Sequence, residues 1–184
     1  MEKIILLLFI LGAVSIIATD SIVLPIFSIP SFDLKNDIVK VYYNKTEKNS
    51  KLEITVVFKD EDHPCFLADV LYDLYRYFKY GRIKDIETFF LHFSDDGSLK
   101  GIEFPGVYAG DHRFSDTKDL HGSAYFPASE AEFTHGRPII YINTWNHMFG
   151  IKPSFCKENE ILINDYPTSI GTRADAEVKY SWRY

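Results

Sequence analysis

The segment CFLADVLYDLYRYFKYG, residues 65–81, has the clearest periodicity in the chain. Its apolar side chains recur every three or four residues, which is the pattern of one face of an α-helix. Gly81 closes the pattern, because glycine readily takes the left-handed conformation that ends a helix. The apolar face consists of Phe66, Val70, Leu74, Tyr77 and Phe78. The sequence therefore predicts one long amphipathic helix.

Segments typical of β-strands lie on both sides of this helix. Before it, LEITVVF at residues 52–58 is β-branched and bounded by charged residues, which predicts a strand. After it, extended segments are predicted at residues 87–93, 99–104, 123–126, 138–143 and 160–164, and near 178–182. A strand, a helix and then several strands is the order of an α+β domain.

The length and charge of the chain limit its organisation and its partners. With 184 residues and 46% hydrophobic composition, the chain is sufficient for one well-buried domain. Its formal net charge of -6 provides no basic surface for phosphates, which excludes a nucleic-acid partner. The same charge disfavours an acidic membrane surface, so we expect no membrane contact beyond a signal peptide.

The first residues have the layout of a secretory signal peptide. Lys3 precedes an apolar run at residues 4–17, and small residues follow it. The run is shorter than the roughly 20 residues of a membrane-spanning helix, and an uncleaved anchor is the alternative. We therefore predict a signal peptide at residues 1–18, an extended segment at 19–37, and secretion of the protein.

Two further features agree with export. Asn44-Lys45-Thr46 is a sequon for N-glycosylation at Asn44. Cys65 and Cys156 would be the two thiols of the mature chain, and two cysteines can form a disulfide in an oxidising compartment. Two separate buried thiols are the alternative reading.

The stretch AGDHRFSDTKDLHGSAYFP, residues 109–127, is rich in potential metal ligands. His112, Asp116 and His121, with Asp111, could form a zinc site with three or four ligands. A solvated polar loop without metal is the competing reading. Calcium is the other candidate ion, because its ligands are oxygen atoms on loops. The aspartates available to it are Asp95, Asp96, Asp111, Asp116 and Asp119.

The phrase Ala124-Tyr125-Phe126-Pro127, the strand residues 140–143 and the pair Gly110-Asp111 together resemble the matrixin family of zinc metalloproteases. The order of elements is similar to that family from about residue 38 to 149. The resemblance implies a twisted mixed sheet of about five strands with one long helix. It also implies one domain at residues 38–184, with an irregular tail that diverges from about residue 151.

The chain departs from the matrixin pattern at its metal sites. The three histidines that hold the family's structural zinc correspond to Ala109, Ser123 and Tyr141, and the aspartate position alone is filled, by Asp111. The catalytic His-Glu-x-x-His helix is missing, since His147 is the single histidine after residue 139. The resemblance therefore implies a catalytically incomplete domain.

The aromatic segment at residues 145–149, WNHMF, allows two interpretations. If exposed, it would form a binding patch, and if buried, it would close the core under the sheet. Burial is the favoured interpretation, because Trp and Phe contribute most to the cores of small domains.

These observations favour a secreted, matrixin-like binding domain over an enzyme. We expect it to bind an extracellular protein or peptide along an edge strand formed by Ser123, Ala124, Tyr125 and Phe126. One alternative is a zinc metalloendopeptidase, or a fragment of one, with ligands such as His112, His121 and His147. Another is a small secreted effector or structural protein. Zinc and calcium are candidate cofactors, and neither is required.

Overall fold

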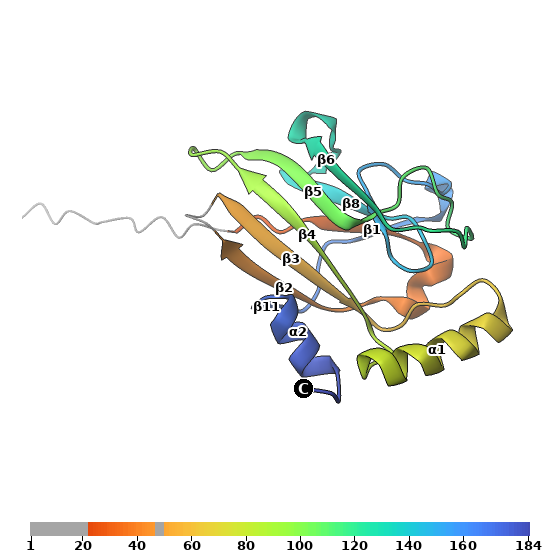
Figure 1. Ribbon diagram of the computed structural model, residues 1–184. Coiled ribbons are helices and arrows are strands. Elements are labelled where there is room, and N and C mark those ends of the chain that lie inside the picture. Colours follow the sequence, from red (N-terminus) through yellow and green to blue (C-terminus); the bar gives the residue numbers. More distant parts are fainter. Residues whose placement is uncertain (1–21, 47–49) are drawn as a thin grey trace, which may run out of the picture.

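The computed structural model describes residues 22–46 and 50–184, and strands form most of its regular structure (Figure 1). The strands are β1 (Ile26–Pro30), β2 (Ile38–Thr46), β3 (Lys51–Phe58), β4 (Asp85–Phe93), β5 (Leu99–Tyr108), β6 (Gly122–Pro127), β7 (Phe133–Thr134), β8 (Arg137–Ile142), β9 (Phe149–Gly150), β10 (Glu160–Ile163) and β11 (Thr168–Ile170). The helices are α1 (Phe66–Tyr80) and α2 (Arg173–Tyr180), with short 3-10 turns η1 (Ser31–Asn36), η2 (Ala128–Glu130) and η3 (Lys157–Asn159). Within these ranges, no helix has the length and apolar character needed to cross a membrane.

One mixed sheet runs through the molecule in the order β10-β1-β8-β9-β5-β4-β3-β2-β11, with β6 paired to β5 and β7 to β8. Its centre is an antiparallel meander from β2 to β5. The pairs β1 with β8 and β11 with β2 are parallel. Because each strand is rotated relative to its neighbour, a sheet of this width curls. Here it forms a half-barrel (Figure 1).

The alternation of side chains along β3 explains how both faces of the sheet are covered. Leu52, Ile54 and Val56 are buried in the main hydrophobic core. Val57 points to the opposite face, because successive side chains on a strand alternate. There it packs in a smaller cluster with Ala176 of α2. The short C-terminal helix therefore covers the outer face of the sheet beside β3 and β4.

The predicted α+β architecture of about five strands with one long helix is wrong. The protein is mostly β, and its sheet includes strands from both ends of the chain. Within the segment expected to be merely extended, residues 19–37, β1 pairs with both β8 and β10. Such pairings join residues distant in sequence, so no local periodicity reports them. The segments predicted as strands between residues 52 and 164 are confirmed as parts of β3, β4, β5, β6, β8 and β10.

The irregular tail and the strand predicted near residues 178–182 are also wrong. The tail contributes β10 and β11 to the sheet and then forms α2. Thr172 and Asp175 make a capping box at the start of α2, with the Asp175 carboxylate accepting hydrogen bonds from the backbone N–H and the hydroxyl of Thr172. This reciprocal cap satisfies the free N–H groups of a first turn. Thr172 and Asp175, three residues apart, are the sequence signal that could have indicated the start of α2.

Segment 145–149 is buried, as the favoured interpretation predicted. Met148 and Phe149 are inaccessible to solvent, and Trp145 is nearly so. The indole N–H of Trp145 donates to the carbonyl oxygen of Asp116 at 2.8 Å, which satisfies its polar edge. This segment therefore belongs to the core and offers no binding patch.

The helix predicted between Phe66 and Gly81 is confirmed, but its orientation is unusual. Gly81 is the C-cap, with φ at 70° and its N–H donating to the carbonyl oxygen of Tyr77. An amphipathic helix on a globular domain normally turns its apolar stripe to the core. In α1 the apolar residues face solvent, whereas Arg76 is buried.

Candidate functional site

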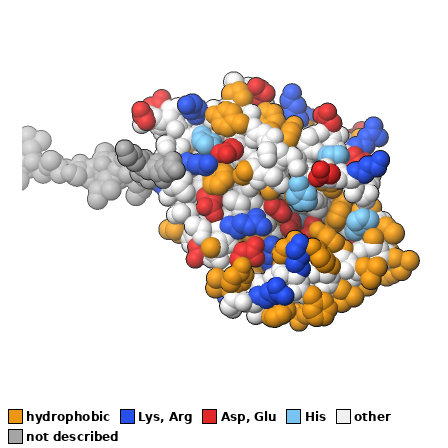
Figure 2. Space-filling model, in the orientation of Figure 1, with side chains coloured by type: hydrophobic (Ala, Val, Ile, Leu, Met, Phe, Trp, Pro, Cys, Tyr) orange, Lys and Arg blue, Asp and Glu red, His pale blue; other side chains and the backbone are white. Residues whose placement is uncertain are grey.

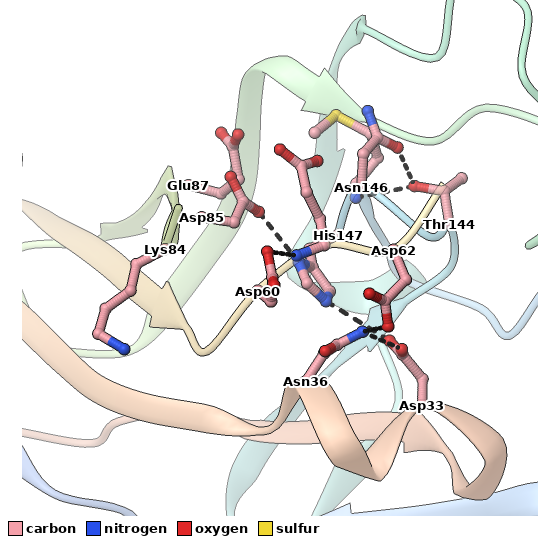
Figure 3. Close-up of polar contacts among 12 residues, drawn as sticks. Asp33, Asn36, Asp60, Asp62, Lys84, Asp85, Glu87, Thr144, Asn146 and His147 are labelled. Atoms are coloured by element: carbon pink, nitrogen blue, oxygen red, sulfur yellow. Dashed lines mark hydrogen bonds and ion pairs between the residues drawn. The ribbon is translucent and has the colours of Figure 1, made fainter. Parts of the chain in front are cut away.

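His147 lies at the centre of a buried ionic cluster (Figure 3). Its Nδ1 atom is 3.0 Å from Oδ2 of Asp85, and its Nε2 atom is 3.4 Å from Oδ2 of Asp33. The imidazole stacks on the Phe58 ring with 3.9 Å between centroids. Burial alone would lower the pKa of His147, but the two carboxylates outweigh it and raise the pKa to about 9. His147 is therefore an imidazolium ion at neutral pH.

This imidazolium links three separated parts of the chain. Asp33 belongs to η1, Asp85 begins β4, and His147 lies between β8 and β9. The side-chain amide of Asn36 extends the network by donating to Asp33 at 2.9 Å and to Asp62 at 2.8 Å. Because His147 is fully buried between two acidic side chains, it is a structural ion rather than a base available to a substrate.

Arg76 is the second buried cation, and it holds α1 on the body of the protein. Its Nε atom is 2.8 Å from Glu61, and its Nη1 atom is 3.0 Å from Asp60. The side chain is 1% exposed, yet its Nη2 atom is buried and has no hydrogen-bond partner. Asp73 Oδ1, which lies 3.5 Å from Nη1 of Arg76, is also buried without a hydrogen-bond partner, so this ionic cluster contains unsatisfied polar atoms of both charges.

A pocket of about 470 Å³ adjoins this arginine. It is bounded by α1, β4, β5, the start of α2 and the loop before β6. Its polar lining comprises Glu61, Arg76, Arg82, Asp85, Glu87, Thr88, His121, Asn146 and Arg173. Its rings and apolar surfaces come from Tyr72, Tyr80, Phe90, Pro105 and Val107. A concave site with apolar walls and convergent polar groups is the usual form of a small-molecule site.

The carboxyl groups of this pocket differ in their protonation. Burial, reinforced by Asp85, raises the pKa of Glu61 to about 8, although Arg76 opposes the shift. Burial and Asp85 also raise the pKa of Glu87 well above its usual value. Burial acts in the same sense on Asp85, but the hydrogen bond from His147 holds its pKa below the usual value. Glu61 and Glu87 therefore hold their protons more tightly than free carboxyl groups do, whereas Asp85 releases its proton more readily.

The arginines on the other side of the pocket keep their charge. Arg82 makes a two-point contact with Glu177, at 3.0 and 3.1 Å. Arg173 lies 3.6 Å from Glu87 and 3.5 Å from Glu177. The lining therefore contains three guanidinium groups, those of Arg76, Arg82 and Arg173, beside the carboxyl groups of Glu61, Asp85 and Glu87. Its chemistry suits an anion with an apolar body.

The residues predicted to bind metal do not converge. His112 and Asp116 form a pair 3.4 Å apart, and Asp116 also accepts a hydrogen bond from the backbone N–H of Arg113. Asp111 lines a separate hollow, and His121 lines the pocket beside Arg76. In the part of the chain that the structure describes, no three His, Cys, Asp or Glu residues are grouped so that they could hold a metal ion.

The remaining predicted positions are placed as follows. Residues 123–126 lie in β6, and this strand pairs with β5 alone among the described residues. Cys65 and Cys156 are both exposed and free. Asn44 lies in β2 and is half-buried. Its glycosylation stays a prediction. The signal peptide falls on residues outside the described ranges and also stays a prediction.

Sequence reasoning missed most of this pocket. Arg76 carries no local signal of burial, because it lies opposite the apolar stripe of the predicted helix, where a residue normally faces solvent. Asp33 and Asp85 carry no motif and meet His147 only in the folded chain. The capping pair Thr172 and Asp175, which flanks Arg173, was the one sequence signal that could have placed a further pocket residue at a defined position.

Comparison with known proteins adds no assignment. No family model matches the chain, and neither curated proteins nor solved structures gave a match. The resemblance to matrixins therefore stays a prediction, while the five-stranded fold it implied is wrong.

Proposed function

We propose that the protein is a binding domain for a small organic anion, which occupies the pocket beneath α1. The observation that carries this proposal is a concave pocket whose lining includes the guanidinium groups of Arg76, Arg82 and Arg173. Guanidinium groups bind carboxylates and phosphates with paired hydrogen bonds.

The rest of the lining defines the ligand further. The rings of Tyr72, Tyr80 and Phe90 favour a flat apolar body over a bare inorganic ion. The raised pKa values of Glu61 and Glu87 favour their protonated forms, which can donate hydrogen bonds to an anion. An aromatic carboxylate is the simplest molecule with this combination of features.

The test is calorimetric titration of the protein with benzoate and, separately, with inorganic phosphate. Benzoate should bind in roughly the millimolar range or tighter. Arg173→Gln removes one guanidinium of the lining from a partly exposed position and should weaken binding roughly tenfold. Arg113→Gln is the matched control, because Arg113 lines another hollow. Equal weakening by both variants, or no benzoate binding up to about 10 mM, would refute the proposal.

A second candidate function is the binding of an extended peptide at β6, as expected from the sequence. It is supported by the pairing of β6 with β5 alone within the described ranges and by the exposed side chains of Ser123 and Tyr125. A peptide could add to this edge as a further strand. The partner would be an extracellular protein if the proposed signal peptide exports the chain.

Amide hydrogen exchange tests this second candidate. An alternating valine-threonine peptide should slow exchange within residues 123–126 if it adds to the edge. Slowed exchange at another strand, or at none, would contradict it. Tyr125→Glu should weaken the effect, whereas Phe133→Glu, at another exposed aromatic residue, should leave it unchanged.

A further inference from the structure

The outer face of α1 is an extended apolar surface. Seven side chains form it, and each is at least 44% exposed. They are Phe66, Leu67, Val70, Leu71, Leu74, Tyr77 and Phe78. Figure 2 shows hydrophobic side chains gathered along the edge of the molecule that α1 occupies in Figure 1. Contiguous apolar surfaces of this kind mark interaction sites.

The opposite face of α1 fixes this orientation. Arg76 is held by Glu61 and Asp60, and the Tyr72 ring packs on the edge of Trp145 at 5.7 Å between centroids. At the start of the helix, Asp69 accepts a hydrogen bond from the backbone N–H of His63. Turning the apolar face inward would break these buried ionic contacts. The outward apolar face is therefore built into the fold.

The C-terminal residues extend this surface past the end of α1. The guanidinium of Arg183 donates to the carbonyl oxygen of Lys79 at 2.8 Å. The backbone N–H of Trp182 donates to the carbonyl oxygen of Gly81 at 2.9 Å. These bonds satisfy carbonyl groups that a helix end leaves free. They also place the exposed Trp182 ring beside Tyr77, at 5.8 Å between centroids.

The rim of the surface has the composition of a membrane–water interface. Trp182, Tyr184 and Tyr75 are exposed amphipathic rings, which prefer the headgroup level of a bilayer. Lys79 and Arg183 supply cations at the same end of α1, and long basic side chains can extend toward phosphates while their stems contact apolar groups.

We propose that the protein docks on a zwitterionic phospholipid surface through the outer face of α1, with the helix lying in the plane of the interface. An amphipathic helix with Phe and Leu on one face and basic residues at its rim is suited to this position. Figure 1 shows α1 at the edge of the domain, so its exposed side chains can enter the headgroup layer together. The net charge of -6, from which we expected no membrane contact, opposes binding to an anionic surface but not to a zwitterionic one.

Vesicle flotation tests this proposal with the full chain. The protein should float with phosphatidylcholine vesicles, and the double variant L71E/F78E should lose roughly tenfold or more of this binding. Both side chains are more than 60% exposed, so the substitutions do not disturb the core. Ile170→Glu is the matched control, because Ile170 is 77% exposed on β11 and should be neutral. Replacing part of the lipid by phosphatidylserine should weaken binding.

Fluorescence and light scattering complete the test. Trp182 emission should shift to the blue on vesicles, and Trp182→Phe should remove the shift because Trp145 is already buried. Absence of flotation, or flotation unchanged by L71E/F78E, would overturn the proposal. A dimer in solution that L71E/F78E dissociates, without vesicle binding, would assign the surface to a second copy of the chain instead.

Discussion

The imidazole of His147 lies 3.0 Å from the carboxylate of Asp85, and this hydrogen bond joins the connection between β8 and β9 to the start of β4. Asp85 also lines the pocket beneath α1. The buried ion pair therefore favours the ionised form of Asp85 at the pocket. It also connects the segment between β8 and β9 to the start of β4.

Removing the imidazolium should destabilise the protein strongly. His147→Leu leaves the buried carboxylates of Asp33 and Asp85 without a cation, which costs about 3 to 5 kcal/mol when one partner of a buried pair is removed. Urea unfolding measures the change. His112→Leu, in a partly exposed loop, should stay within about 0.5 kcal/mol. Similar unfolding free energies for the two variants would contradict a stabilising role for His147.

Stability should fall as the pH rises from about 6.5 to 9. The pKa of His147 is raised from 6.5 to about 9 in the folded state, so its contribution is fully present below 6.5 and is lost as the pH passes 9. The raised pKa of Glu61 acts in the same direction, because the folded state also holds that proton more tightly. The loss due to His147 is about 3 kcal/mol.

Urea unfolding near pH 6 and near pH 10 measures this loss. His147→Leu should reduce the pH dependence of the unfolding free energy. The remaining pH dependence should include the part caused by the raised pKa of Glu61. A wild-type protein that is equally stable, or more stable, at the higher pH would show that His147 is not held as an imidazolium.

Benzoate affinity should decrease as the pH rises through about 8. Glu61 is uncharged below its raised pKa and gains a negative charge beside Arg76, Asp85 and the bound anion above it. Titration calorimetry at two pH values measures the change. Glu61→Gln keeps a neutral donor at every pH and should flatten the profile. Tighter binding of benzoate at high pH would rule out this assignment of protons.

The cap of α2 should contribute measurably to stability. The Thr172 hydroxyl and Asp175 form the capping box, and Thr172→Ala should cost about 1 kcal/mol in thermal or urea unfolding. Thr117→Ala, in an exposed loop, is the control and should have no measurable effect. An equal effect of the two substitutions would mean that α2 is not docked as described.

The sequence predicted the elements with strong local patterns and failed where distant segments pair. Residues 52–58 and 65–81 have clear periods, and β3 and α1 follow them. In contrast, β1 and β11 are short and join the sheet through parallel pairs with β8 and β2. Parallel partners are far apart along the chain, so only the completed sheet reveals them.

The site was less predictable than the fold, for a related reason. His147 stood out as the single histidine of its region, but its partners Asp33 and Asp85 have no fixed spacing to it. Arg76 lies opposite the apolar stripe of α1, where a solvent-exposed residue is the normal expectation. Its burial follows from the ionic contacts of the helix with Glu61 and Asp60.

The most direct test of the central claim is to follow the side-chain nitrogen resonances of Arg76 by NMR during a benzoate titration. Because Arg76 lines the pocket, these resonances should shift in a saturable manner, with the same dissociation constant as the calorimetric binding. Benzoate binding that leaves Arg76 unshifted, while moving resonances elsewhere in the protein, would contradict the assignment of the pocket.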